Sequence, residues 1–286
     1  MKRITENRTI SYIIITIIYI LATFIGVLTY NALDFEWWIN LLIADIAATV
    51  VTFIFSLIFK NASVYDTYWS VQPMVILAAL AIGRAITPLR IMLLVAVCLW
   101  GIRLTVNWAY TFPSLAHQDW RYTMLKEKTG IFYPIINFVG IHMVPTLVVW
   151  GCVLPAAYAF IFDVEANRGS VFFILVSIAA TIMQGTADFQ MHKFRKNRTS
   201  TFIRNGLWKH SRHPNYLGEI LMWWGIALSV IFADGDAMIF CLGAVANTLL
   251  FFFVSIPLAD GRQSSKPGFD DYRSETRMLL PIKKFK

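Results

Sequence analysis

Charged side chains are scarce in this sequence. Aspartate, glutamate, lysine and arginine make up 15% of the 286 residues, whereas hydrophobic residues make up 57%. Soluble globular domains carry about 25% charged residues, so this composition excludes an ordinary soluble domain. The apolar residues form long continuous runs, without the alternation that a transmembrane β-barrel needs. The sequence therefore predicts an all-α, polytopic transmembrane helical bundle.

Cysteine is also rare, and its placement excludes two kinds of site. Cys98, Cys152 and Cys241 lie far apart inside apolar runs, so they predict neither a disulfide framework nor a CxxC metal motif. The only clustered histidines are His192, His210 and His213. They lack cysteine or acidic partners at ligand spacing, and we expect no metal site.

Eight hydrophobic stretches reach or approach the roughly 20 residues that a helix needs to cross a bilayer. They are Ile10–Tyr30, Trp37–Phe59, Val71–Gly83, Ile91–Tyr110, Ile131 or Phe138 to Phe162, Val171–Phe189, Tyr216–Phe232 and Ala237–Leu258. The third is short. The fifth contains three prolines, which allow one kinked span or a span plus a re-entrant segment. We expect seven to eight spans in a single membrane domain over residues 1–286.

Positive charge predicts the orientation of the bundle. The net charge is +8, and of the 25 lysines and arginines only Arg84, Arg90 and Arg168 fall in the alternate connections. The positive-inside rule therefore places the N-terminus, the C-terminus and the basic segments 190–214 and 259–286 on the cytoplasmic side. No nucleic-acid-binding motif accompanies the charge, so we expect membrane lipid and not nucleic acid as the partner. The sequence predicts no oligomeric state.

Asp45, Arg103 and Asn107 are polar residues that lie within the predicted spans. A lone charge at bilayer depth costs about 3 kcal/mol or more, so Asp45 and Arg103 are expected either to pair with each other or to line a polar cavity. Asn107 is four residues after Arg103 and shares its helical face. Arg103 and Asn107 are therefore candidates for the wall of a substrate cavity.

Two loops on the predicted cytoplasmic side combine acids with aromatic residues. Asp66 and Tyr68 lie in the first, and Asp119 and Tyr122 lie in the second. Interfacial belts explain tyrosine and tryptophan at such places but not the acids beside them. These loops and the segment HSRHPNYLGE (210–219) predict one site that opens to the cytosol.

The segment HSRHPNYLGE should begin a membrane helix. Pro214 suits the first turn of a helix, and Asn215 and Glu219 then share a face. Upstream, Asp188 and Arg195 are seven residues apart and also share a face if the preceding helix extends beyond the membrane. Free N–H groups at a helix start favour a phosphate. The surrounding positive side chains are Arg195, Arg198, Arg204, Lys209, Arg212 and His213. This arrangement predicts a pocket for a cofactor that carries phosphate and amide groups.

The segments that flank this helix should also be folded. Five apolar side chains in the 190–214 connection are expected to act as packing anchors: Phe194, Phe202, Ile203, Leu207 and Trp208. In the tail, the pattern predicts a short amphipathic helix over Phe269–Leu280, ended by Pro281. Tyr272, Thr276 and Leu279 would share one face of that helix.

These motifs resemble the C-terminal domain of the steroid 5-alpha-reductase superfamily. The resemblance rests on Arg212–Glu219 (RHPNYLGE), on Asp188 and Arg195, and on Tyr272 followed by Leu280-Pro281. The elements DTYWS, GIRLTVNW and DWRY are similar to a bacterial branch of that superfamily. The resemblance covers residues 60–282, with a cofactor-binding part at 180–282. It implies a helical bundle in a bacterial cytoplasmic membrane that binds NADPH from the cytosol and reduces an activated C=C bond of a lipid.

The resemblance also assigns residues. It implies dinucleotide contacts at nine positions: Asp188, Arg195, Arg212, His213, Asn215, Tyr216, Glu219, Arg262 and Tyr272. The chain departs from the reductases around Asp260–Arg262, where it has fewer arginines and no aromatic run. No residue matches the acid and tyrosine that hold the substrate carbonyl in the eukaryotic enzymes. Asp66, Tyr68 and Tyr122 are the candidates for that catalytic role.

Two other functions stay open. Isoprenylcysteine and phospholipid methyltransferases, which use S-adenosylmethionine, share a similar RHPxYxG segment. Their tail carries a Glu-Glu pair where this chain has SSKPGFDDY, which favours the reductase. A non-enzymatic lipid transporter could use Asp45 and Arg103 along a substrate path. Against this, no inverted repeat is visible, and the polar groups gather on one face.

Overall fold

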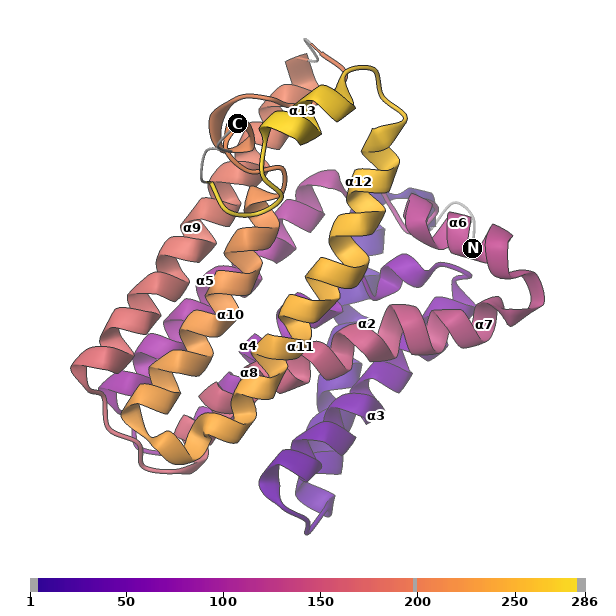
Figure 1. The fold of residues 1–286 in the computed structure, drawn as a ribbon. Helices are drawn as coiled ribbons and strands as arrows, with labels where there is room; N and C mark the ends of the chain where they lie inside the picture. Colours follow the sequence, from indigo (N-terminus) through magenta and orange to yellow (C-terminus); the bar gives the residue numbers. More distant parts are fainter. Residues whose placement is uncertain (1–4, 198–199, 282–286) are drawn as a thin grey trace.

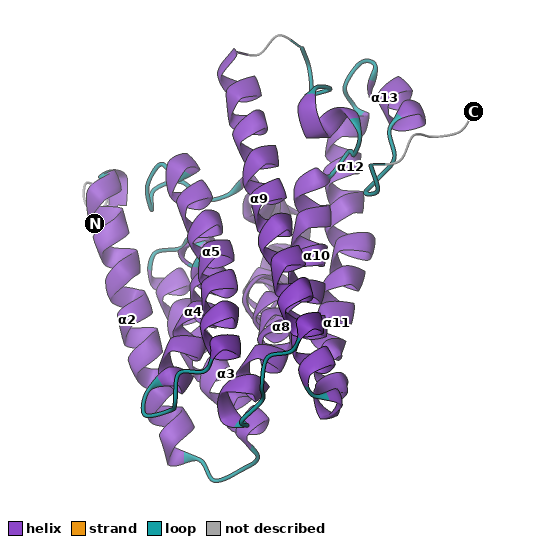
Figure 2. Cartoon of the chain, turned by 90° about the vertical axis from the view of Figure 1, so that its left-hand side faces the viewer, coloured by secondary structure: helices purple, strands orange, loops and turns teal. Residues whose placement is uncertain are grey.

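Helices make up most of the chain in the computed structural model, which describes residues 5–197 and 200–281. Those residues contain no β-strand, and the helices pack side by side (Figures 1 and 2). The long helices are α2 (Arg8–Ala32), α3 (Trp37–Ile58), α4 (Tyr68–Ala81), α5 (Pro88–Thr111), α8 (Val144–Ile161), α9 (Arg168–Asn197) and α10 (Pro214–Ala233). The shorter ones are α6 (Trp120–Thr129), α7 (Tyr133–Ile136), α11 (Leu242–Leu250), α12 (Ile256–Ser264) and α13 (Phe269–Glu275). The prediction of an all-α bundle is confirmed.

Within the described residues, seven helical segments are long and apolar enough to cross a membrane: Arg8–Ala32, Trp37–Ile58, Pro88–Thr111, Trp120–Ile161, Arg168–Asn197, Pro214–Ala233 and Gly235–Ser264. The remaining expected span is α4, which has 14 residues. At 1.5 Å per residue it is about 21 Å long, less than the ~30 Å hydrocarbon core. It still reverses the chain direction, so the start of α2 and the helix α13 lie at one end of the bundle (Figure 2).

The proline-rich fifth region is one helical segment. Helices α6, α7 and α8 follow one another, joined by a 3₁₀ turn (Gly130–Phe132) and a π-helical turn (Asn137–Met143). Pro134 and Pro145 lie in the first turns of α7 and α8, where a missing N–H is tolerated. The whole region thus forms one interrupted helical segment and one candidate span, Trp120–Ile161.

The interior is packed closely enough to bring two helix backbones together. Trp100, Trp223 and Phe160 are among the largest fully buried side chains. Helices α8 and α11 touch at Gly151 and Gly243, where a Cβ on Gly243 would lie 2.0 Å from the carbonyl carbon of Gly151. Small residues allow such close approach between membrane helices.

The tail differs from the sequence prediction. Helix α13 ends at Glu275 instead of Leu280, because Thr276 is extended. The following carbonyls accept backbone hydrogen bonds: Arg277 from the N–H of Arg212 at 3.0 Å, and Met278 from the N–H of His213 at 3.2 Å. A helix through 280 would keep these carbonyls for itself. Thr276 and Leu279 are nevertheless buried, as Tyr272 is.

The 190–214 connection is folded against the bundle. Ile203 and Trp208 are buried with Ala187, and Phe194 and Leu207 pack against them. Phe202 is buried with Phe269 and Tyr272 of the tail. All five predicted anchors therefore pack. Arg198, expected among the surrounding positive charges, lies outside the described residues.

Candidate cofactor and active site

Arg103 of α5 joins two acids on neighbouring helices. Its guanidinium donates to the Asp188 carboxylate of α9 at 2.6 Å and lies 3.6 Å from the Glu219 carboxylate of α10. The side chains of Arg103 and Asp188 are only 15% and 16% exposed. Four residues after Arg103, Asn107 shares a 2.6 Å hydrogen bond with His192 of α9. The predicted shared face of Arg103 and Asn107 thus faces α9.

Glu219 is held on several sides. It accepts hydrogen bonds from the indole N–H groups of Trp100, at 2.9 Å, and of Trp223, at 3.1 Å. The side-chain amide of Gln184 donates to it at 2.9 Å. With Arg103 nearby, both carboxylate oxygens are satisfied by the protein itself. Glu219 therefore positions its neighbours, and a cofactor is not needed to satisfy it.

The expected Asp45–Arg103 pair is wrong. Asp45 is buried and accepts a 3.2 Å hydrogen bond from the Tyr68 hydroxyl, and it also accepts one from the Gln72 amide. Asp45 on α3 faces α4, whereas Arg103 on α5 faces α9 and α10. Tyr68, one of the three catalytic candidates, therefore belongs to this buried group, and among the described residues no hydrogen bond joins it to Asp66 or Tyr122.

Asp66 and Tyr122 are brought together by their loops. The Tyr122 hydroxyl donates to the Asp66 carboxylate at 2.5 Å. The two loops are also fastened by a 3.0 Å hydrogen bond from the Asp119 N–H to the Ser63 hydroxyl. Burial raises the pKa of Asp66 to about 6, although the Tyr122 hydrogen bond and the Arg121 charge work against this shift. The structure thus pairs an acid that titrates near neutrality with a phenol.

The predicted helix start is confirmed, because α10 begins at Pro214. Asn215 is half-buried in its first turn, and its side-chain oxygen is buried without a hydrogen-bond partner. The next residue, Tyr216, stacks on the His213 ring, with centroids 5.2 Å apart and planes 6° from parallel. Asn215 therefore has an unused acceptor beside a flat aromatic surface.

Arg212 and His213 bind the tail. Both contact the Asp260 carboxylate of α12, Arg212 at 3.0 Å and His213 at 2.9 Å. Arg212 also donates to the Thr276 carbonyl at 2.6 Å. The Tyr272 hydroxyl donates to the Trp208 carbonyl, and burial raises the pKa of Tyr272 to about 12, so the phenol stays protonated. Sequence reasoning missed Asp260 as the partner, although its segment was the one that departed from the reductases.

Helix α6 links the Asp66–Tyr122 pair to the end of α12. The Arg262 guanidinium lies over the Trp120 ring, 3.9 Å from its centroid, a cation–π geometry. Arg121, the next residue, interacts electrostatically with both Asp66 and Tyr216. Arg262 thus contacts α6 across the bundle end where α12 and α6 meet (Figure 1). Arg195 is exposed on α9 and acts electrostatically on Asp188.

Several buried polar atoms around this end have no hydrogen-bond partner among residues 5–197 and 200–281. They are the Nε atoms of Arg103, Arg212 and Arg277, and the side-chain oxygens of Asn215 and Gln263. Buried polar groups are normally hydrogen-bonded, so each of these atoms requires an explanation. Guanidinium donors suit phosphate, and amide oxygens suit amide or hydroxyl donors. The residues fit a phosphorylated, amide-bearing ligand. Among the residues described, no group of three or more metal-ligating side chains is suited to a metal ion.

Comparison with known proteins gives a family and no individual relative. None of the curated proteins and none of the solved structures matches this chain. The model of one family, described as "Protein of unknown function (DUF1295)", matches residues 52–276. That range includes every candidate site residue and excludes α2 and the first part of α3. The chain therefore belongs to the DUF1295 family.

Proposed function

We propose that this membrane protein is an NADPH-dependent reductase of an activated C=C bond in a lipid enone. The proposal is supported by the motifs similar to the steroid 5-alpha-reductase superfamily and by the clustering of their residues at one end of the bundle. The observation on which it chiefly depends is the unpartnered Asn215 oxygen at the start of α10. It lies four residues before the Arg103-bound Glu219.

In this proposal the protein's residues hold and orient the reactants. Asn215 accepts from the cofactor amide, and Tyr216 offers a flat face. Arg195, exposed on α9, and Arg262, exposed on α12, bind phosphate. The abundance of arginine suits the extra phosphate of NADPH. Arg103, Asp188 and Glu219 fix the relative positions of α5, α9 and α10. When bound, NADPH supplies the hydride.

The proton side of the reaction is assigned to Asp66 and Tyr122. When Asp66 is protonated, its O–H can donate to the Tyr122 oxygen across their 2.5 Å contact. The phenol O–H is then available to donate to a substrate carbonyl, and Asp66 can return a proton to the phenol after the transfer. The pKa of Asp66, about 6, keeps part of its population protonated near neutral pH. Tyr68, bonded to Asp45, is the alternative proton donor.

The first test is thermal unfolding of the purified protein with NADPH, NADH or S-adenosylmethionine. A ligand that binds the folded state raises its apparent stability. Stabilisation by NADPH supports the reductase. Stabilisation by S-adenosylmethionine alone would replace the proposal with a lipid methyltransferase. No stabilisation by any of the three, with or without a lipid enone, would favour a transporter.

The matched variants are Asn215→Ala and Asn31→Ala. Because the Asn215 oxygen has no intramolecular partner, its removal should leave the unfolding temperature of the ligand-free protein nearly unchanged and abolish the NADPH-dependent shift. Asn31 is exposed at the end of α2, so its replacement should keep the shift. An Asn215→Ala protein that responds fully to NADPH would contradict this placement of the cofactor.

A further inference from the structure

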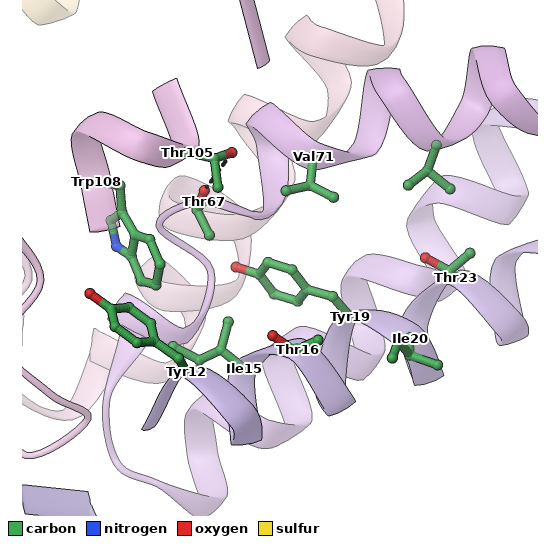
Figure 3. A pocket seen from close by; sticks show the side chains of 11 residues that line it. Tyr12, Ile15, Thr16, Tyr19, Ile20, Thr23, Thr67, Val71, Thr105 and Trp108 are labelled. Atoms are coloured by element: carbon green, nitrogen blue, oxygen red, sulfur yellow. Dashed lines mark hydrogen bonds between the residues drawn. The ribbon is translucent and has the colours of Figure 1, made fainter. Parts of the chain in front are cut away.

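Helix α2 stands beside a cavity that none of the site residues lines. The cavity has a volume of about 410 Å³ and lies between α2, the α4 segment and α5 (Figure 3). This volume is in the range of small-molecule sites, ~300–1,000 Å³. Its walls are mostly hydrocarbon and aromatic, from Ile15, Ile20, Val71 and Val75 among others. Ile20 is 64% exposed, so the cavity is a groove that opens on the outer surface of the bundle.

The groove is closed at one end. There Arg8 and the Tyr12 hydroxyl both donate to the Ala109 carbonyl at 2.6 Å, fastening α2 to the end of α5. Tyr12 also meets Trp108 with ring centroids 5.8 Å apart. Tyr19 lies farther along α2, with its ring 5.6 Å from Tyr68. Figure 3 shows Tyr12 and Trp108 at one end of the groove and Thr23 at the other.

The length of the groove matches one leaflet of a bilayer. From Tyr12 to Thr23 the helix rises about 16 Å. That is about half of the ~30 Å hydrocarbon core. A groove of this length can therefore hold most of one lipid chain, which spans about one leaflet.

A cluster of hydroxyls lies toward the Trp108 end of the groove, and Thr16 and Thr23 of α2 also line the groove (Figure 3). The hydroxyls of Thr67 and Thr105 lie 3.2 Å apart, and Ser70 is 3.1 Å from each of them. Thr67 directly follows Asp66 in the chain. A lipid lying in the groove would thus have its oxygen-bearing end near hydroxyl donors and near the backbone that carries the Asp66 carboxyl group.

We propose that the groove between α2, α4 and α5 binds one hydrocarbon chain of a lipid, with the polar end of that lipid at Thr67 and Thr105. The assigned occupant is an acyl chain of a bilayer phospholipid, because the groove opens on the outer surface of the bundle at Ile20. The chain of a prenyl or steroid-like enone is the alternative outcome of the test. The family match covers residues 52–276 and does not include α2. The side of the groove that α2 forms therefore lies outside the matched residues. The inference does not depend on the reductase activity.

The test is photolabelling of the full chain in phospholipid vesicles. The vesicles contain phosphatidylcholine with a diazirine in its acyl chain, and labelled residues are mapped by peptide mass spectrometry. We expect Thr16, Val71 and Val75 to be labelled more strongly than Ile102, which faces outward on α5 and is 54% exposed. Val71→Trp, which fills the groove, should reduce labelling of Thr16 and Val75 several-fold. Val106→Trp is the control, because Val106 is 61% exposed on α5 and does not line the groove.

The outcomes are separable. Equal labelling of groove and outward residues, or labelling unchanged by Val71→Trp in a protein that unfolds at the parent temperature, overturns the proposal. If Val71→Trp does not fold, the parent protein is labelled in the presence of an unlabelled single-chain lipid instead. This lipid should then displace the label from the groove. Displacement of the label by an added enone lipid, and not by an equal amount of unlabelled phosphatidylcholine, would overturn the phospholipid assignment in favour of a substrate chain. Neither result depends on the NADPH titration.

Discussion

The guanidinium of Arg103 donates to the carboxylate of Asp188 at 2.6 Å, joining two helices across 85 residues of sequence. Glu219 lies 3.6 Å from the same guanidinium. These contacts place one positive charge between two acids from different helices. The arrangement fixes α5 against the α9–α10 pair, from which the candidate cofactor residues project.

Replacing Arg103 by methionine should destabilise the protein by about 3–5 kcal/mol, because two mostly buried carboxylates lose their shared counter-charge. Thermal unfolding in detergent measures the effect. Lys193→Met, at an exposed position of α9, is the control and should be nearly neutral. Adding Asp188→Asn to Arg103→Met should recover part of the loss, and a double variant as unstable as the single one would contradict the assignment.

Glu219→Gln should lower the stability of the protein by about 1–3 kcal/mol. The N–H₂ group of the new glutamine would replace one carboxylate oxygen and would face N–H donors of neighbouring side chains, which would lose their acceptor. This outcome differs from that expected for Asn215→Ala, which removes no intramolecular bond. Comparing the two unfolding temperatures without ligand separates a positioning residue from a ligand contact. Equal temperatures would show that the Glu219 network contributes little.

The Asp66 carboxyl group should make stability depend on pH. Its pKa is about 6 in the folded protein against an ordinary value of 3.8, so folding favours the protonated form. The stabilisation that the protonated Asp66 carboxyl group contributes is complete below about pH 4 and is lost as pH rises through 6. Asp66→Asn should remove this pH dependence. The stability of the variant relative to that of the parent should therefore increase as pH rises. Unfolding temperatures measured across this range test it, and a constant difference between the two proteins would refute it.

Tyr122→Phe provides an independent check on the same group. The Tyr122 hydrogen bond favours the ionised carboxylate. Without it the pKa of Asp66 should rise further, and the loss of stability should move to higher pH. A shift in the opposite direction would mean that Tyr122 does not donate to the carboxylate.

Asp260→Asn should loosen the tail. Arg212 and His213 each contact one oxygen of this carboxylate. An asparagine side chain has a single oxygen, so it accepts less well from both residues than the carboxylate does. Limited proteolysis should then cleave the turn between α12 and α13 faster than in the parent. Asp270→Asn, in the exposed first turn of α13, is the matched control. Equal cleavage of all three proteins would show that the tail is held by its apolar and backbone contacts alone.

Gly243→Ala should destabilise the bundle, because its Cβ would meet the backbone of Gly151 at 2.0 Å. Overpacking of this kind typically costs about 1–3 kcal/mol. Gly261→Ala, on α12 with no atom within 4 Å of the added Cβ, should be neutral or slightly stabilising. Similar unfolding temperatures for the two variants would mean that α8 and α11 can separate at little cost.

The class of the protein and the local geometry of its helices follow from the sequence alone. Long apolar runs require helices in a membrane, because backbone groups must be satisfied within the segment. Pro214 marked the start of α10, and the spacing of Asn215 and Glu219 placed both on one face. The position of Asp66 and Tyr122 in two loops at one end also followed from the order of spans. These are properties of single helices and of their connections.

The tertiary structure decided which polar groups meet. Arg103 pairs with Asp188 and not with Asp45, because helix rotation and neighbour choice depend on packing along the whole bundle. Helix α13 ends before Thr276, because the backbone N–H groups of Arg212 and His213 donate to the carbonyls of the residues that follow it. Helical periodicity specifies the face on which a residue lies. Only the packed bundle specifies what that face contacts, since the partners come from segments distant in sequence.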